Sequence, residues 1–127
     1  MAPAALFLID SAACATPEMA GAVVVTGSHG GDSAAGFLLA VQPLLAVFND
    51  AGGGLDDAGV SGLHRLEAAG IAAVTVAHTS ARIGHADSTW QDGVISRVNA
   101  SAAALGLVPG QVCRVALGAL CSPAPAG

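Results

Sequence analysis

The chain has 127 residues, of which 54% are apolar, 10% are charged and 3% are aromatic, and its net charge is −5. These values exclude a disordered tail and a coiled coil, and the length predicts a single domain over 1–127. All four basic residues are arginines, so no basic patch is available for nucleic acid, and no segment approaches the ~20 apolar residues that span a bilayer.

The scarcity of charge also bears on assembly and location. A surface with so few charged side chains leaves apolar area exposed, and contacts between copies would cover it, so a homo-oligomer is expected. The start of the chain has no positive charge before its apolar run, unlike a secretion signal. Three cysteines without metal-ligand spacing are typical of reduced thiols, and together these features predict a cytoplasmic protein.

The first half of the chain alternates apolar runs with polar turns. Continuous apolar stretches, the second of them a β-branched run, predict buried strands over 6–9, 22–26 and 44–48. Thr16 predicts the start of a short helix between the first two strands. A longer helix, capped by Asp32 or Ser33 and running to about residue 41, follows the second strand and is stopped by Pro43.

The second half continues the alternation and ends in a weaker pattern. Its last long helix carries Trp90 and Asn99, which are expected as packing and surface residues. The predicted elements, in order, are a helix capped by Asp56 or Asp57 and ended by Gly70, a strand over 71–76, a helix from Asp87 or Ser88 to about 105, one short helix after 109–110, and a frayed tail over 122–127.

Strands that alternate with helices predict the α/β class. The expected architecture is a three-layer α/β/α sandwich with a mostly parallel sheet of about four strands. In such folds the strand-to-helix turns lie at the carboxyl edge of the sheet, where ligands bind. Polar side chains concentrate in these turns, whereas the strands contain almost none. The sequence therefore predicts a site at this edge.

The first glycine-rich turn, 27–31, contains His29 between small residues. Gly30 and Gly31 would let backbone N–H groups face a ligand, and the following helix N-terminus suits an anion. His29 is a candidate general acid or base, because imidazole exchanges protons near neutral pH. The alternative is a tight turn with a surface histidine. The spacing is not a dinucleotide fingerprint, and no phosphate-binding G-x-x-x-x-G-K motif occurs.

The second turn, 49–57, carries three carboxylates around a glycine-rich bend. These groups could orient His29, hold a divalent cation or contact the substrate. Asp50 is the best candidate because it directly follows a strand. The alternative is that Asp56 and Asp57 cap a helix while Asn49 and Asp50 close a turn.

The third turn, 80–84, contains Ser80 and Arg82. A guanidinium at this edge could bind a carboxylate or phosphate through paired hydrogen bonds, and an ion pair with Asp50 or Asp57 is the alternative. His78 and His85 flank the turn and could add to the site. No zinc spacing occurs, and neither a cofactor nor a resident metal is expected.

Two resemblances arise from these motifs. The segments TGSHGG, FNDAG and SARIG resemble a family of small uncharacterised bacterial α/β proteins over nearly the whole chain, which implies no activity. Over about 22–80 the layout is similar to the caspase-hemoglobinase fold and its CHAT relatives. That similarity implies a histidine–cysteine dyad with His29 as the histidine. The cysteine position falls near 51–52, where no thiol is present, so the resemblance implies layout rather than peptidase chemistry.

These observations predict a small cytoplasmic enzyme, a hydrolase, lyase or isomerase, that acts on a small polar or anionic metabolite by acid–base chemistry. His29 would transfer the proton and Asp50 would assist it. The substrate-binding set would comprise Ser28, Gly30, Gly31, Asn49, Asp56, Asp57, Ser80 and Arg82. The alternatives are a noncatalytic ligand-binding or assembly module and a metal-assisted enzyme that uses the aspartate cluster with His29.

Overall fold

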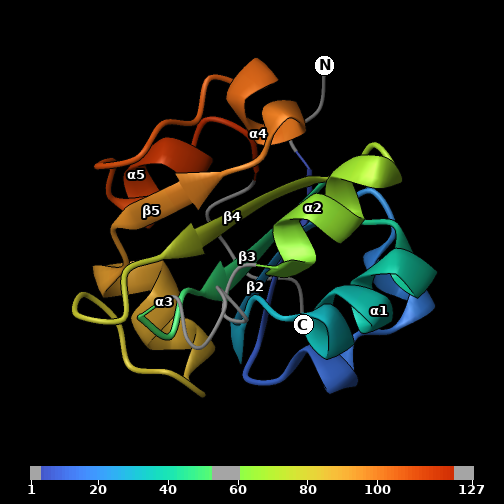
Figure 1. The fold of residues 1–127 in the computed structure, drawn as a ribbon, viewed down its shortest axis with the longest axis horizontal. Coiled ribbons are helices and arrows are strands. Elements are labelled where there is room, and N and C mark those ends of the chain that lie inside the picture. Colours follow the sequence, from blue (N-terminus) through green and yellow to red (C-terminus); the bar gives the residue numbers. More distant parts are fainter. Residues whose placement is uncertain (1–3, 53–60, 122–127) are drawn as a thin grey trace.

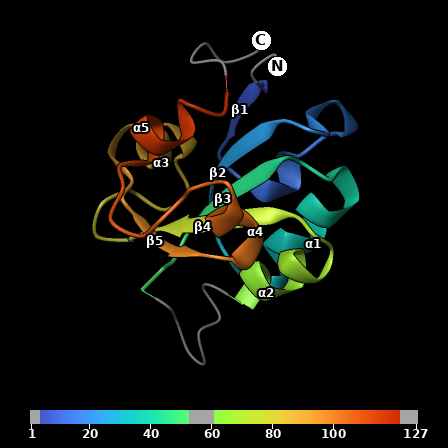
Figure 2. The ribbon, with the colours of Figure 1, turned by 90° about the horizontal axis from the view of Figure 1, so that it is seen from above.

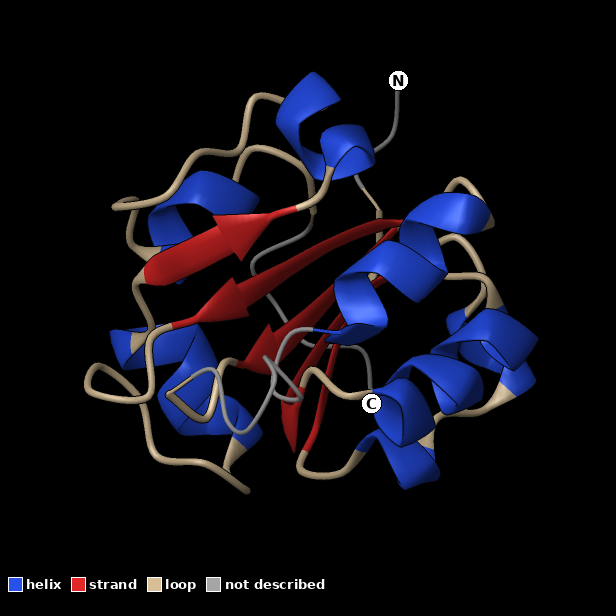
Figure 3. Ribbon diagram, in the orientation of Figure 1, coloured by secondary structure: helices blue, strands red, loops and turns tan. Residues whose placement is uncertain are grey.

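A computed structural model describes residues 4–52 and 61–121 of the chain. Its centre is one five-stranded sheet in which the strand order follows the sequence order (Figure 1). The first four strands are parallel, and the fifth is antiparallel to the fourth (Figure 3). The strands are β1 (Leu6–Ile9), β2 (Val23–His29), β3 (Leu45–Asn49), β4 (Ala72–Val76) and β5 (Ile95–Val98).

The α/β class and the mostly parallel sheet are confirmed, and all four predicted strands form. Val23, Val24 and Val25 are fully buried, as a continuous apolar run predicts for a strand covered on both faces. The predicted number of strands was one too low because β5 was not expected.

Five α-helices and two short 3-10 helices surround the sheet within the described residues. They are η1 (Ala12–Cys14), η2 (Pro17–Met19), α1 (Asp32–Val41), α2 (Ser61–Ala68), α3 (Ala86–Asp92), α4 (Ala100–Ala104) and α5 (Cys113–Leu117). The predicted short helix after Thr16 is η2. Gly31, rather than Asp32 or Ser33, is the cap of α1. Among these helices, none is long and apolar enough to cross a membrane.

The buried side chains form two clusters, one on each face of the sheet. Side chains alternate between the faces of a strand, so Val24 joins the cluster with Leu38 of α1 and Leu66 of α2. Its neighbour Val25 joins the cluster with Trp90 of α3. Figure 2 shows α1 and α2 on one side of the sheet and α3 and α5 on the other.

The predicted helix from Asp87 or Ser88 to about 105 is wrong. The chain leaves α3 at Asp92, forms β5 and re-enters a helix only at α4. Gly93 makes this possible, since a Cβ there would overlap the Thr89 carbonyl oxygen and lie 2.8 Å from Val76 Cγ1. Asn99, expected on a helix surface, is instead buried and caps α4 by accepting a hydrogen bond from the N–H of Ala102.

Two sequence predictions fall outside the described residues. Asp56 and Asp57, with the proposed helix cap, lie in the segment 53–60. The predicted frayed tail is 122–127. The helix that Gly70 was predicted to end is α2, and Gly70 has a left-handed φ of 75°.

Candidate functional site

The first turn, the third turn and the described part of the second, 49–52, meet at the carboxyl edge of the parallel strands (Figure 1). His29 at the end of β2 pairs in register with Asn49 at the end of β3. The N–H of Asp50 donates to the carbonyl of Val76 at the end of β4, at 2.9 Å. The sequence thus predicted correctly that these segments are neighbours.

The loops after β3 and β4 line an open hollow of about 340 Å³. Its lining residues are Asn49, Ala51, His78, Ala81, Arg82 and Ile83. This volume lies at the small end of the ~300–1,000 Å³ that ligand pockets usually occupy. The hollow therefore suits a small molecule.

Asp50 and His78 form a bonded pair beside this hollow. His78 Nδ1 lies 3.3 Å from Asp50 Oδ1, and the same oxygen accepts the N–H of His78 at 3.0 Å. It also accepts the N–H of Gly52 at 2.8 Å. With Nδ1 turned toward the carboxylate, Nε2 is the ring nitrogen left to exchange a proton with a ligand.

The electrostatic environment keeps the Asp50 carboxyl ionised. Burial raises its pKa, but hydrogen bonds from the Gly52 N–H, the Ser96 side chain and His78 lower it, and the net pKa lies below the ordinary 3.8. Ser96 is held in turn by Thr75, whose hydroxyl lies 2.9 Å from the Ser96 hydroxyl. A polar chain thus leads from the sheet interior to His78.

Arg82 contributes a cation to the hollow. Its backbone N–H donates to Ser88 Oγ at 2.9 Å, which fixes the loop. Within the described ranges its guanidinium forms no hydrogen bond or ion pair, and the side chain is exposed. Of the alternative ion pairs, the one with Asp50 is not formed, because that carboxylate bonds to His78 instead, and the one with Asp57 lies outside the described residues.

His29 is an exposed residue at the end of β2 and is not among the residues lining the hollow. The contact that the structure shows for Asp50 is with His78 rather than with His29. The catalytic role of His29 stays a prediction. His78, which the sequence suggested only as a flanking residue, holds the position beside the carboxylate.

The polar side chains of Ser28 and Asn49 are bonded to the backbone. Ser28 Oγ accepts the N–H of Ala12 at 2.9 Å and joins the turn to η1. Asn49 is fully buried, donates from Nδ2 to the carbonyl of Ala81 at 3.1 Å and accepts the N–H of Ala51 at 2.8 Å. The Asn49 bonds therefore hold two walls of the hollow together.

Ser80 has a similar position in the third turn. Its hydroxyl donates to the carbonyl of Ala77 at 2.7 Å and accepts the N–H of Val94 at 2.9 Å. The side chain therefore ties the loop after β4 to the segment that enters β5. A contact between Ser80 and substrate stays a prediction, as it does for Ser28 and Asn49.

The glycines of the first turn are closely packed. The N–H of Gly30 donates to the backbone carbonyl of Asn49. The carbonyl of Gly30 accepts the N–H of Gly62 in α2 at 2.7 Å. A Cβ on Gly62 would lie 2.6 Å from the carbonyl oxygen of Gly31. The glycines thus allow α2 to approach the turn, and an anion-binding role for Gly30 and Gly31 stays a prediction.

Two residues that received no role from the sequence hold the Arg82 loop in place. Asp10 Oδ1 accepts the N–H of Ala86 at 2.9 Å, although 76 positions separate the two residues. Gly27 allows the loop to approach β2, since a Cβ there would overlap the backbone of His85 and lie 2.5 Å from the carbonyl carbon of Gly84. The position of Asp10 directly after a strand was the available signal.

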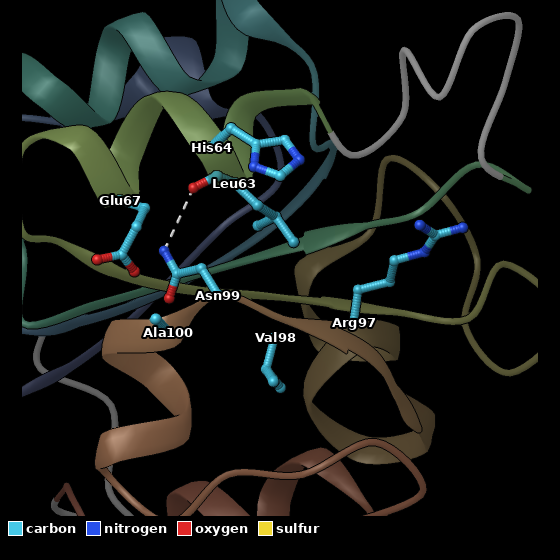
Figure 4. Close-up of a pocket in the computed structure, with 7 residues that line it drawn as sticks. All are labelled: Leu63, His64, Glu67, Arg97, Val98, Asn99 and Ala100. Carbon is cyan, nitrogen blue, oxygen red and sulfur yellow. Dashed lines mark hydrogen bonds between the residues drawn. The ribbon is translucent and has the colours of Figure 1, made fainter.

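A second hollow, of about 410 Å³, lies between α2 and β5 (Figure 4). Two of its polar residues have structural partners: Asn99 bonds to the carbonyl of Leu63, and Glu67 accepts both the N–H and the hydroxyl of Ser101. Arg97 lies apart from Glu67 at the other end of the hollow. The carboxyl-edge hollow is therefore the better candidate site.

No known protein family, curated protein or solved structure matches this chain. Among the described residues, no group of three or more His, Cys, Asp or Glu side chains could hold a metal ion. The metal-assisted alternative relied also on Asp56 and Asp57, which lie outside those residues. Function is therefore argued from the geometry of the hollow.

Proposed function

We propose that the carboxyl-edge hollow is the active site of a small enzyme, a hydrolase, lyase or isomerase, that acts by acid–base chemistry on a small polar or anionic metabolite. The observation that supports the proposal is the Asp50–His78 pair beside a hollow that Arg82 also lines. The hollow thus combines the permanently charged guanidinium of Arg82 with the imidazole of His78, which can exchange a proton, in a volume that suits a small molecule.

Each of the three side chains has a distinct role in this proposal. His78 transfers the proton through Nε2, and Asp50 orients the ring through Nδ1. Arg82 holds the anionic group of the substrate. His29, on the adjacent strand, is the competing proton-transfer group.

The proposed location is the cytoplasm. Cys14, Cys113 and Cys121 are all free thiols, as a reducing compartment favours. Two of these thiols are buried in the core and serve as small packing residues.

Substrate consumption tests the catalytic proposal. The protein is incubated with small carboxylates, esters, amides and hydroxy acids, and proton NMR follows each compound. We expect at least one compound to be converted. The His78→Gln variant should convert it at least about 100-fold more slowly, because a general acid or base is lost. His64→Gln, an exposed histidine on α2, is the matched control and keeps the full rate.

The variants also separate the two histidines. Conversion that survives in His78→Gln but is lost in His29→Gln would transfer the role to His29. If none of the compounds in the panel is converted, the catalytic proposal is contradicted and a noncatalytic ligand-binding module is favoured.

A second candidate function, assembly, is favoured by an apolar groove of about 440 Å³ along α5. Val115 is 65% exposed there, and Leu105 and Val112 are also exposed. We propose that contacts between copies cover this groove in a homo-oligomer.

Sedimentation at micromolar concentration tests the assembly. We expect an oligomer that Val115→Asp converts to monomer, because a charge would be buried in the contact. Phe37→Asp, at an exposed apolar residue of α1, is the control and stays oligomeric. A wild-type chain that sediments only as a monomer would refute the proposal.

A further inference from the structure

The hollow offers a ligand one cationic contact, one imidazole and an apolar wall. Ala51, Ala81 and Ile83 supply the apolar wall, and Ile83 is 50% exposed. The amide of Asn49 is already bonded on both its oxygen and its nitrogen to backbone groups. A polyol would therefore find few side-chain partners, whereas a short aliphatic group with one polar end would fit.

The charges around the hollow favour a single negative charge on that ligand. Arg82 is the one cationic side chain among the described residues that line it. The ionised Asp50 carboxylate lies directly behind His78, and the whole chain carries a net charge of −5. A second negative charge on a ligand would meet no second permanently charged cation among the described lining residues and would be repelled by Asp50.

Geometry favours a carboxylate as the charged group. A guanidinium presents parallel N–H donors that match the two oxygens of a carboxylate, and Arg82 has these donors unbonded within the described part of the chain. A carboxylate carries the single charge that the hollow can balance.

We infer that the hollow binds a short-chain monocarboxylate, with its carboxylate on Arg82 and its aliphatic part against the apolar wall. The inference rests on the proposed function in taking this hollow as the substrate site, and it names the substrate class. The reacting part of the molecule then lies beside His78.

Three matched compounds test the inference on the intact protein. Isobutyrate is the monocarboxylate, and isobutyramide is its neutral counterpart. In methylmalonate, a second carboxylate replaces one methyl group of isobutyrate. Amide signals in ¹H–¹⁵N NMR spectra report binding at each residue. We expect isobutyrate to shift the signals of Ala51, His78 and Ile83 saturably, and the other two compounds to bind at least about tenfold more weakly.

Two arginine variants complete the experiment. Arg82→Gln should weaken isobutyrate binding by about tenfold or more. Arg114→Gln, at an exposed arginine of α5 that does not line the hollow, should leave binding within about twofold. Equal binding of isobutyramide, tighter binding of methylmalonate, an unaffected Arg82→Gln variant or no binding of isobutyrate would each overturn the inference.

The binding readout keeps this inference separate from the catalytic proposal. If isobutyrate binds as expected but no compound is converted, the enzyme proposal fails and the ligand class stands. If His78-dependent conversion occurs without isobutyrate binding, the ligand class alone fails.

Discussion

The Asp50 carboxylate has two functions at the end of β3. One oxygen closes the turn through the N–H of Gly52 and also holds the backbone and ring of His78. The sequence predicted Asp50 as a site residue because it directly follows a strand. Its partner could not be predicted, since His78 is 28 positions away and reaches Asp50 only through the conformation of the next loop.

The lowered pKa of Asp50 predicts an acid-dependent loss of stability. A carboxyl whose pKa is lower in the folded state contributes its full stabilisation above the unfolded pKa, near 3.8, and loses it as the pH falls through the folded pKa. Below about pH 4, the free energy of unfolding should therefore fall more steeply for the wild type than for Asp50→Asn. Urea unfolding between about pH 2.5 and 7 measures both slopes, and equal slopes would contradict the prediction.

Asn99 joins three elements through one buried side chain. Its oxygen accepts the N–H groups of Ala73 and Ala102, and its nitrogen donates to the carbonyls of Leu63 and Ile71. The sequence predicted Asn99 as a surface residue of a long helix, and three of its buried partners, 26 to 36 positions away in sequence, are visible only in the folded chain.

We expect Asn99→Ala to lower the free energy of unfolding by about 3 kcal/mol, because a helix cap is lost and buried backbone groups lose their partner. Asn99→Asp keeps the acceptor but places a carboxylate oxygen against the carbonyls of Leu63 and Ile71, so at neutral pH its loss should be at least as large as that of the alanine variant. Chemical denaturation measures both. A loss below about 1 kcal/mol in Asn99→Ala would show that these bonds contribute little.

At the scale of elements, local signals predicted the four parallel strands and missed the fifth. The parallel strands are continuous apolar runs followed by polar turns, and each signal lies within a few residues. β5 has only four residues, and Ser96 and Arg97 interrupt its apolar character. Flanked by helix-forming segments, it resembles part of a helix until its pairing with β4 is known.

Gly93 is the position that should respond most clearly to this arrangement. Gly93→Ala should lower the free energy of unfolding by about 2 kcal/mol, because the new methyl group overlaps the Thr89 carbonyl and crowds Val76. Gly36→Ala is the control with the opposite sign, expected to stabilise by about 0.5–1 kcal/mol, because Gly36 lies within α1 and the nearest atom, from Arg65, is 3.4 Å from the new Cβ. Thermal unfolding measures the midpoint temperatures of both variants. An unchanged midpoint for Gly93→Ala would contradict the close packing of Gly93 against Thr89 and Val76.

For the whole molecule, the sequence predicted where the scarce polar side chains gather but not what they contact. Ser28, Asn49 and Ser80 lie at the predicted edge, and their side chains bond to backbone groups of other residues. Arg82 lies at the same edge and lines the hollow. A turn needs the same residue types to satisfy its backbone as to hold a ligand, so sequence alone cannot separate the two uses.

The three thiols report on the integrity of the whole fold. Cys14 is exposed, whereas burial, with a smaller effect from the nearby Cys121, raises the pKa of Cys113 to about 12. Burial also raises the pKa of Cys121. A disulfide reagent should therefore label Cys14 rapidly in the native protein and the other two only in denaturant, because the thiolate is the reactive form. Cys14→Ser should lack the rapid phase, and rapid labelling of all three native thiols would contradict the burial.

The strand order has a consequence for how the chain acquires its structure during synthesis. Each strand from β1 to β5 lies beside the strand that precedes it in sequence, so a growing chain can add strands one at a time. The bridge between Ala4 and Cys121 is different, because it joins the first and last described segments. This contact can form only after the chain through Cys121 has been synthesised. It therefore joins the end of the chain to an assembled sheet at the edge formed by β1, the first strand to be made.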